Sequence, residues 1–545
     1  MKEAISILMK FFFNASLAGA ILLVTLTEAH AQQYDIKQST TDVKGPEHAL
    51  LPCSNGDYIT ITYPFTDDND PVIVARFDHT LNQKYSTPIV DLKKIHYRSN
   101  LYINGRLALF CNDKDGNVSR YDVDEKTGAL AGSPTSLFTF QAKEDDTKFY
   151  TGNAPGKNFH YFVTKQRIKK EKGAILQGVI LDQQYGKVTD FNFTTPEDNG
   201  DFNKIDFLQS DDGTLYMIYS VNLKTSKDDY TPHAYKVVMV DTKGATRNFP
   251  MNGIPKGDLG HVSWSIDGSR LSFTGLIAHE KKNGYTTVFT GSIDFQKKKG
   301  SFHQTELGTL IAKVPDYLQK VKDNGIPISV ELLRTMKLSD GSHIVILEDN
   351  GSYVYQSHYA PMSPSNPGYS SAPASLRMGT MSSYSITYYN RGNLYLIKTD
   401  ANNIPQWMNI VTKNQREGDM AIAIGTACTI DSKDNVHLFF EDNRKDKAPD
   451  IKKPKEVDGL KSKKNKLACV TVDPTGEMTK TFIDVDKPKY RPMLEKSEGD
   501  VRNELCFMAI RKHTAFSIDH MLNHADYRIS TITITPGAAP ALAGN

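Results

Sequence analysis

The sequence predicts an all-β protein, and more specifically a β-propeller built from four-stranded blades. Short apolar runs rich in Val, Ile, Tyr, Phe and Thr alternate with Gly, Asn and Asp along almost the whole chain, a pattern typical of strands and turns. These strand-like runs recur in a fixed order. Such internal repetition is the sequence signature of a repeat architecture.

The first repeated element is a turn followed by a strongly apolar strand. Asn55-Gly56-Asp57 precedes YITITY, Asp212-Gly213 precedes TLYMIYS, and Asp340-Gly341 precedes SHIVILED. Further copies begin near residues 104, 267 and 433, and degenerate copies occupy residues 156–163 and 504–510. We interpret each copy as a tight turn that leads into an inner strand of a blade.

The second repeated element is a strand that ends in Asp and is followed by a turn with Gly or Asn. Seven clear copies contain Asp78, Asp122, Asp182, Asp241, Asp294, Asp400 and Asp473, and a weak copy lies at 526–535. Two hairpins per repeat give a four-stranded sheet, which is the blade of a propeller.

The repeat count favours eight blades over seven. A ring must close to remove exposed sheet edges, and residues 33–39 are suited to add the missing outer strand to the last blade. Two stacked β-sandwiches are the alternative, but they do not explain the same Asp turn at seven places.

One stretch, residues 310–322 (LIAKVPDYLQKVK), has helical spacing. Because proline is tolerated in the first turn of a helix, we expect a short inserted helix that begins near Pro315.

The first 31 residues predict an export signal peptide. Lys2 and Lys10 precede an apolar run, and Ala29-His30-Ala31 supplies a cleavage site with small residues at both ends. The apolar run is too short to span a bilayer, so we expect no membrane span. The prediction is an exported chain, periplasmic or at the cell surface, with one propeller domain over residues 32–545 and long insertions at 350–392 and 443–466.

Charge and cysteine content exclude two further classes of protein. With 65 basic and 63 acidic residues, the chain lacks the excess of cations that a nucleic-acid-binding protein needs. Five cysteines are too few for a disulfide scaffold, and most lie in apolar runs, which predicts buried thiols. If two of them pair, we expect Cys428 and Cys469, which fall on strands that we place side by side.

Two segments carry a resemblance to known proteins. Residues 265–273 (SIDGSRLSF) resemble the repeat of propellers related to the periplasmic protein TolB. Residues 392–415 (GNLYLIKTDANNIPQWMNIVTKNQ) look like a segment of secreted, functionally unassigned proteins of Bacteroidota. The resemblance implies a propeller fold and export, and it transfers no catalytic residue.

Candidate binding residues lie in the long loops, which we expect to gather on one face of the ring, where propellers usually place function. The insertion at 443–466 is strongly basic and would suit an anionic polysaccharide or an acidic protein partner, although a solvated loop has the same composition. The insertion at 350–392 is rich in Tyr, which suits sugar or protein contacts but also loop packing. The binding candidates are Lys452, Lys453, Lys463, Lys464, Tyr355, Tyr359, Tyr388 and Tyr389.

A weaker catalytic candidate is a pair of carboxylates. Glu348 and Glu441 occupy matching positions in the sequences LEDN and FEDN, and paired carboxylates could perform glycosidic acid–base chemistry. Common descent of the repeats also explains the match. No motif for a metal, a cofactor or a catalytic nucleophile occurs. The sequence therefore favours a non-enzymatic binding or scaffold protein that holds a polysaccharide or protein partner, with a carbohydrate hydrolase or lyase as the alternative.

Overall fold

The structure is a computed structural model. It describes residues 33–44, 47–63, 71–89, 95–103, 105–140, 147–166, 173–196, 202–222, 233–251, 259–278, 284–310, 325–358, 383–418, 424–458, 465–483, 490–498, 502–511 and 526–535. The predicted signal peptide and the predicted helix near Pro315 lie outside these residues. A four-residue helix, α2 (Leu307–Leu310), ends at the first residue of the stretch 310–322 that has helical spacing.

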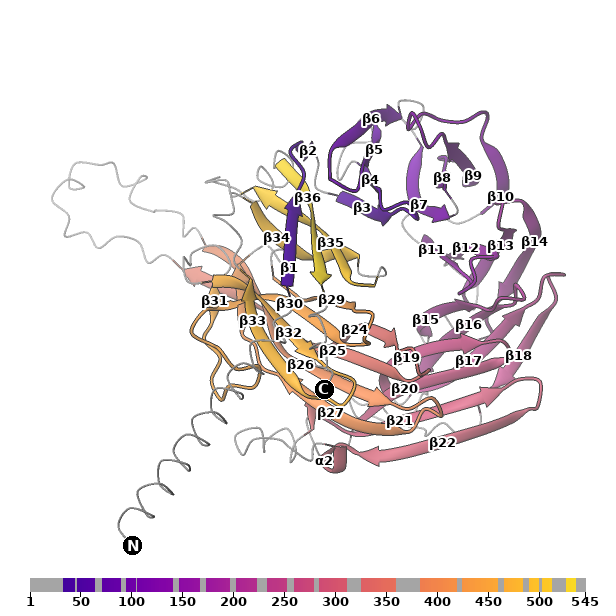
Figure 1. The fold of residues 1–545 in the computed structure, drawn as a ribbon. Helices are drawn as coiled ribbons and strands as arrows, with labels where there is room; N and C mark the ends of the chain where they lie inside the picture. Colours follow the sequence, from indigo (N-terminus) through magenta and orange to yellow (C-terminus); the bar gives the residue numbers. More distant parts are fainter. Residues whose placement is uncertain are drawn as a thin grey trace, which may run out of the picture.

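The described strands form eight sheets arranged in a ring, which confirms the eight-bladed propeller (Figure 1). Blade 1 contains β3 (Glu47–Pro52), β4 (Tyr58–Tyr63), β5 (Val72–Phe77) and β6 (Gln83–Ile89). Blade 2 contains β7 (His96–Ile103), β8 (Arg106–Asn112), β9 (Asn117–Val123) and β10 (Thr135–Thr139). Blade 3 contains β11 (Thr147–Asn153), β12 (Phe159–Gln166), β13 (Ile175–Asp182) and β14 (Lys187–Thr194). Blade 4 contains β15 (Phe202–Gln209), β16 (Leu215–Asn222), β17 (His233–Val240) and β18 (Thr246–Pro250).

The second half of the ring has the same plan with additions. Blade 5 contains β19 (Leu259–Asp267), β20 (Arg270–Ala278), β21 (Gly284–Asp294) and β22 (Lys299–Glu306), with β23 (Ile326–Pro327) beside β21. Blade 6 contains β24 (Val330–Lys337), β25 (His343–His358), β26 (Ser383–Thr399) and β27 (Pro405–Val411), with β28 (Gln415–Gly418) and β31 (Val457–Asp458) added. Blade 7 contains β29 (Ala427–Ile430), β30 (Val436–Asn443), β32 (Asn465–Val472) and β33 (Met478–Ile483). Blade 8 contains β34 (Tyr490–Glu498), β35 (Glu504–Arg511), β36 (Asp526–Thr535) and β1 (Gln33–Gln38), with β2 (Val43–Lys44) also on β36.

The apolar strands that the sequence predicts as inner strands are the second strands of the blades. In β8 and β30 nearly every residue is buried, because these strands have neighbours on both sides and blades against both faces. Aromatic side chains pack between neighbouring blades. Phe110 of blade 2 stacks on Phe162 of blade 3, with ring centroids 5.0 Å apart.

The Asp turns hold the third and fourth strands of most blades together. In blade 3 the Oδ1 atom of Asp182 accepts the N–H groups of Gln184 (2.8 Å) and Gly186 (2.7 Å), so one carboxylate fixes the whole turn. The same pattern recurs at Asp78, Asp241, Asp400 and Asp473. In blade 2 the prediction that Asp122 is the turn residue is wrong. That residue lies inside β9, and Asp124, two residues later, accepts the turn N–H groups.

The chain ends close the ring as predicted. Strand β1 pairs antiparallel with β36, from Gln33 opposite Thr535 to Gln38 opposite Ser530 (Figure 1). Residues nearly 500 positions apart in sequence thus share one sheet, which leaves blade 8 with a complete set of four strands.

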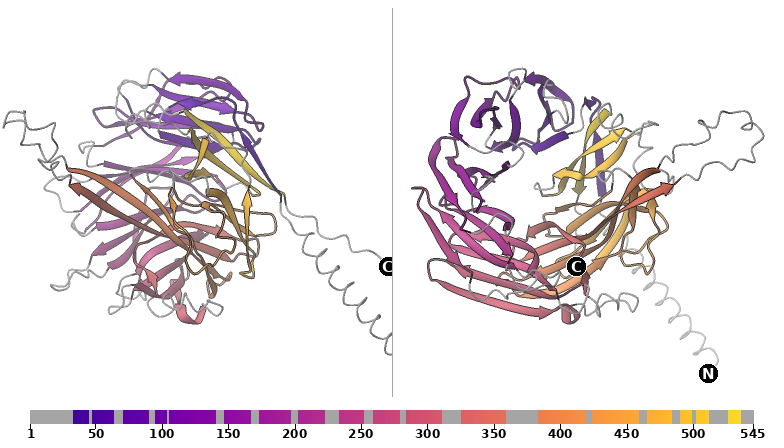
Figure 2. Two further views of the ribbon diagram at one scale, coloured as in Figure 1. Left: turned by 90° about the vertical axis from the view of Figure 1, so that its left-hand side faces the viewer. Right: turned by 180° about the vertical axis from the view of Figure 1, so that it is seen from behind.

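Blade 6 carries the most prominent departure from the repeat. Strands β25 and β26 are 16 and 17 residues long and project beyond the ring (Figure 2). We call the paired stretches 350–358 and 383–391 the arm. The pairing shifts register between Glu348 and Asn350, so a β-bulge marks the point where the arm leaves the blade.

All five cysteines are free and buried, so the expected pairing of Cys428 with Cys469 is wrong. Cys428 on β29 pairs with Leu438 of β30, and Cys469 on β32 pairs with Phe439 of β30. Strand β30 therefore lies between the two cysteine-bearing strands. Strands two positions apart are separated by about 9–10 Å, beyond the reach of a disulfide. Leu438 and Phe439 are consecutive residues, so the two thiols also point to opposite faces of the sheet.

Candidate functional site

The longer connections gather at one end of the strands, as the sequence predicts. Those between the second and third strands of blades 3 to 7 span residues 167–174, 223–232, 279–283, 359–382 and 444–464. Because alternate strands run antiparallel, these connections emerge on the same face, which we call the long-loop face, and the short Asp turns define the opposite turn face. Blade 2 is an exception, since only residues 113–116 connect β8 to β9.

A cavity of about 240 Å³ lies where the arm leaves blade 6. It is bounded by β24, β25 and β26 of blade 6, by β29 and the residue before it in blade 7, and by β34 of blade 8. It combines charged with apolar side chains. Its lining residues are Glu331, Leu332, Leu333, Arg334, Glu348, Arg391, Thr426, Ala427, Cys428 and Leu494. We call it the arm cavity. Its volume is smaller than that of most drug-sized ligand pockets, so it suits a single side chain or one sugar ring.

Arg391 is one of the two arginines that line the arm cavity. It sits opposite Asn350, directly beyond the bulge, and its side chain is only 13% exposed. Its guanidinium lies 3.7 Å from the carboxylate of Glu348 and 3.8 Å from that of Glu331. Both distances exceed those of hydrogen-bonded ion pairs, so these two acids hold Arg391 loosely.

Behind Arg391 lies a buried polar cluster. The side chain of Lys413 has no exposed surface, and its Nζ atom forms an ion pair with Glu348 Oε1. Lys413 Nζ also donates to Gln415 Oε1 and Thr426 Oγ1, both at 2.9 Å, and Thr426 donates to Glu348 at 2.7 Å. This cluster connects blade 6 to the segment that leads into blade 7. Lys413 and Arg391 were not predicted from the sequence, because each is a single cation among polar and aromatic residues and belongs to no motif.

The two carboxylates singled out from the sequence have different surroundings. Glu348 is 5% exposed and is held by Lys413, Thr426 and Arg391. Glu441 is half-buried on β30, and its main-chain carbonyl accepts a hydrogen bond of 2.9 Å from Gln415. The contacts of Glu348 are those of a structural ion pair, and a catalytic partnership with Glu441 stays a prediction.

The first part of the basic insertion, residues 444–458, folds against blade 6, and we call it the basic segment. Strand β31 pairs in parallel with β28, and Thr412 donates its N–H to the carbonyl of Pro449 at 2.9 Å. The carboxylate of Asp446, which is 4% exposed, accepts the N–H of Lys455 at 2.6 Å. These bonds give the segment a defined conformation, which the composition alone did not predict.

The basic segment separates its charges between surface and interior. Its six cations are all exposed, and none forms an ion pair with a residue that the structure describes: Arg444, Lys445, Lys447, Lys452, Lys453 and Lys455. Among its acids, Asp446 is buried and Glu456 lies 3.9 Å from Arg416. The predicted binding residues Lys452 and Lys453 therefore lie on a cationic surface, whereas Lys463 and Lys464 lie outside the described residues.

The predicted tyrosines take several positions. Tyr388 lies at the base of the arm under Arg416, whose guanidinium carbon is 4.1 Å from the ring centroid, a cation–π contact that packs the arm against β28. Tyr389 follows it on β26 and is half-buried. The backbone of Tyr355 belongs to β25, opposite Ile386. Tyr359 lies outside the described residues.

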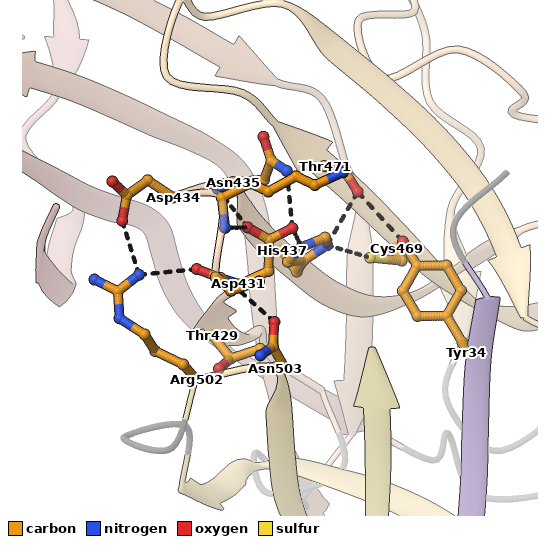
Figure 3. Close-up of polar contacts among 12 residues, drawn as sticks. Tyr34, Thr429, Asp431, Asp434, Asn435, His437, Cys469, Thr471, Arg502 and Asn503 are labelled. Carbon is orange, nitrogen blue, oxygen red and sulfur yellow. Dashed lines mark hydrogen bonds and ion pairs between the residues drawn. The ribbon is translucent and has the colours of Figure 1, made fainter. Parts of the chain in front are cut away.

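A further chain of polar groups lies buried in blade 7 (Figure 3). The imidazole of His437 donates from Nε2 to Asp431 at 3.2 Å, and its Nδ1 lies 3.1 Å from the hydroxyl of Thr471. Tyr34 of β1 reaches Thr471 at 3.3 Å (Figure 3). Burial raises the pKa of Asp431, but hydrogen bonds from His437 and Asn435 outweigh it and lower the pKa to about 2.

The same chain includes a thiol but forms no nucleophilic site. Cys469 Sγ lies 3.9 Å from His437 Nδ1, which resembles the first contact of a Cys–His pair. Burial raises the pKa of the Cys469 thiol to about 12, so it is protonated at neutral pH, and it has no exposed surface. We therefore assign the chain a structural role, in which Tyr34 fastens the closing strand β1 to blade 7.

Over the described ranges, no group of three or more His, Cys, Asp or Glu side chains is arranged to hold a metal ion. Within those ranges, no helix has the length and apolar character needed to cross a membrane.

The strand order defines the protein as an eight-bladed propeller. Comparisons with known proteins do not assign it to a narrower class. No protein-family model matches the sequence, and no curated protein is significantly similar to it. The resemblance to TolB-related propellers therefore stays a prediction.

Solved structures match the chain only at low identity. The WD40 domain of SCAP from fission yeast is 7% identical with a TM-score of 0.40, over 93% of this chain and 98% of that one. A prolyl endopeptidase is 10% identical with a TM-score of 0.36, over 89% of this chain and 55% of that one, so this chain spans only about half its length. A protein of unknown function from Bacteroides caccae is 8% identical with a TM-score of 0.25, over 62% of this chain and 89% of that one. The assignment as a propeller rests on the strand order.

Proposed function

We propose that the protein is an exported, non-enzymatic binding propeller that holds an anionic polysaccharide on its long-loop face. The observation that carries the proposal is the separation of charge in the basic segment. Six exposed cations without described ion-pair partners lie on one ordered segment, while Asp446 is turned inward. Such a surface attracts polyanions in a chain whose net charge is only +2.

Order in the segment strengthens the argument. A cationic loop without fixed structure loses conformational entropy when it binds, whereas a segment already held by main-chain bonds does not. The arm cavity lies beside the same connection, because Lys413 and Gln415 join Glu348 to the carbonyl of Glu441. A polymer bound along the basic segment could thus place one residue near Arg391 at the arm cavity.

Binding to dextran sulfate, an anionic polysaccharide without uronic acid, tests the proposal, with neutral dextran as the comparison polymer. We expect the protein to bind the polyanion, to release it as salt is raised, and not to bind dextran. One variant replaces four cations of the segment by Ala: Lys445, Lys447, Lys452 and Lys453. A matched control replaces four exposed lysines of the turn face by Ala: Lys126, Lys157, Lys243 and Lys299.

The segment variant should lose at least about tenfold in affinity, since four partly screened charges each contribute several tenths of a kcal/mol. The control variant should bind like the original protein. Equal loss in both variants would show that total charge alone is responsible. Absence of polyanion binding together with capture of a single acidic protein would replace the polysaccharide by a protein partner.

A further inference from the structure

A second cavity, of about 360 Å³, opens on the turn face between blades 4 and 5. Its volume lies within the usual range of small-ligand sites. All its walls come from described residues of β16 to β18 and of the turns of both blades. The lining residues are Asp212, Thr214, Tyr216, Met239, Asp241, Ala245, Arg247, Phe249, Ser269, Phe295, Gln296 and Lys298. We call it the turn cavity.

The floor of the turn cavity is apolar and aromatic. Tyr216 lies opposite Met239, and Met239 lies opposite Arg247. These three side chains therefore form one row across the sheet of blade 4. Phe295, from the last turn of blade 5, stacks on Tyr216 with ring centroids 5.4 Å apart. Phe249 packs against Phe295 at 4.9 Å.

Two carboxylates supply hydrogen-bond acceptors at the wall. Asp212 uses its Oδ1 atom to accept the N–H of Thr214 at 2.9 Å. Asp241 uses Oδ1 to accept the N–H groups of Lys243 and Ala245, both at 2.9 Å. The turns therefore fix both carboxylates at the edge of the cavity, and the hydroxyl of Ser210 also donates to Asp212 Oδ1 at 2.5 Å. A carboxylate held in this way is well placed to accept a ligand hydroxyl.

Two cations complete the lining. Arg247 on β18 and Lys298 in the last turn of blade 5 are both exposed, and neither forms an ion pair with any residue in the described part of the chain. They approach the cavity from different blades. Any acidic group that enters it therefore meets positive charge from both blades.

We infer that the turn cavity binds a carboxylated sugar residue, such as a hexuronic acid. The aromatic and Met side chains can contact the apolar C–H face of a pyranose ring, Asp212 and Asp241 can accept its hydroxyl protons, and Arg247 and Lys298 can bind its carboxylate. The two cations favour an anionic sugar over a neutral one. The carboxylates and aromatic side chains favour a sugar ring over a simple inorganic anion, which has neither hydroxyl groups to donate nor an apolar face to pack. The site lies on the opposite face from the basic segment and does not depend on the function proposed above.

Titration with digalacturonate, followed by isothermal calorimetry and by saturation-transfer NMR, tests this site. The disaccharide carries too little charge to be held by the basic segment, which needs a polymer. Arg247→Ala and Lys298→Ala should each weaken binding about tenfold or more, as expected for the loss of a charge-assisted hydrogen bond. Lys243→Ala is the matched control, because Lys243 is exposed in the same turn of blade 4 but does not line the cavity.

The outcomes separate this site from the basic segment. Binding of digalacturonate that is lost in the two cavity variants and kept in Lys243→Ala supports the inference, and digalactose should not bind. Absence of digalacturonate binding, or binding that the cavity variants leave unchanged, overturns it. Arg247 and Lys298 have no described partners in the fold, so an unchanged melting temperature should accompany any loss of binding.

Discussion

The buried imidazole of His160 gives a sharp prediction about acid stability. His160 lies on β12 with no exposed surface, beside the ring of Tyr185 at 5.4 Å, and neither ring nitrogen has a hydrogen-bond partner in the structure. Burial lowers its pKa from 6.5 to about 4, and the more distant charge of Asp182 opposes this only partly. The imidazole of His160 is therefore neutral in the folded protein until the pH falls to about 4.

The sign and size of the effect follow from proton linkage. Below pH 6.5 the unfolded chain binds a proton at this residue that the folded chain does not bind until about pH 4. Stability is therefore complete above pH 6.5 and is lost as the pH falls between these values. The lowered pKa of His160 corresponds to a loss of about 2 kcal/mol in stability at pH 5 and about 3 kcal/mol at pH 4.

His160→Leu should remove this loss, because leucine has a similar volume and no group to protonate. Urea unfolding of both proteins at pH 7.5, 5 and 4, followed by tryptophan fluorescence, measures the difference in stability. The variant should be equal or slightly more stable at pH 7.5, since it removes two unsatisfied buried nitrogens, and its advantage should grow by about 2–3 kcal/mol toward pH 4. The exposed His303→Leu controls for loss of a surface imidazole. Parallel stability curves for His160→Leu and the original protein would refute the argument.

Three further predictions concern the contacts that join blades. Glu348→Gln leaves the ammonium of Lys413 buried without its anion and should cost about 3–5 kcal/mol in urea unfolding, whereas replacing both residues by Met should recover most of that loss; equal instability of the single and double variants would contradict this. Tyr34→Phe removes the hydrogen bond between the closing strand and Thr471 and should lower stability by about 1 kcal/mol. Tyr34→Ala also removes the ring and should expose β1 to proteolysis near residue 33, and identical digestion of both variants would count against the fastening role. Asn403 donates to two main-chain carbonyls of blade 5 at 2.7 and 2.8 Å, so Asn403→Ala should cost about 2–4 kcal/mol by thermal or urea unfolding, and a cost below about 1 kcal/mol would show that water replaces those bonds.

The fold was predictable because each repeat contains a turn whose hydrogen bonds depend only on residues close together in the sequence. An Asp that accepts N–H groups two and four residues later needs only its own turn, so the pattern is visible at Asp182 and Asp241 without any knowledge of the ring. The closing strand was also predictable, because a sheet with three strands leaves an open edge. The position of each strand within its blade was not predictable. The apolar character of β4 or β8 indicates that the strand is buried, but it does not indicate how far the strand lies from the axis of the ring.

The site was less predictable, since its parts come from different blades. The sequence shows Glu348 in a repeated LEDN motif, but the partner Lys413 is 65 residues away and enters through a connection with no repeat pattern. The turn cavity was missed for the same reason. Tyr216 and Phe295 meet only when blades 4 and 5 pack together, and no spacing in the sequence records that contact.

Two buried ion pairs next to the basic segment explain why it is ordered. Besides Glu348–Lys413, Asp442 pairs with Lys480, whose Nζ also donates to the carbonyl of Ala448 at 3.3 Å within the segment. Both lysine ammonium groups lie over the ring of Phe440, at 5.6 and 5.7 Å. Burying such pairs is costly, and apolar residues of similar volume would stabilise the blade at least as well. What an ion pair adds is a fixed orientation, and here both pairs fix the chain that carries the cations of the long-loop face.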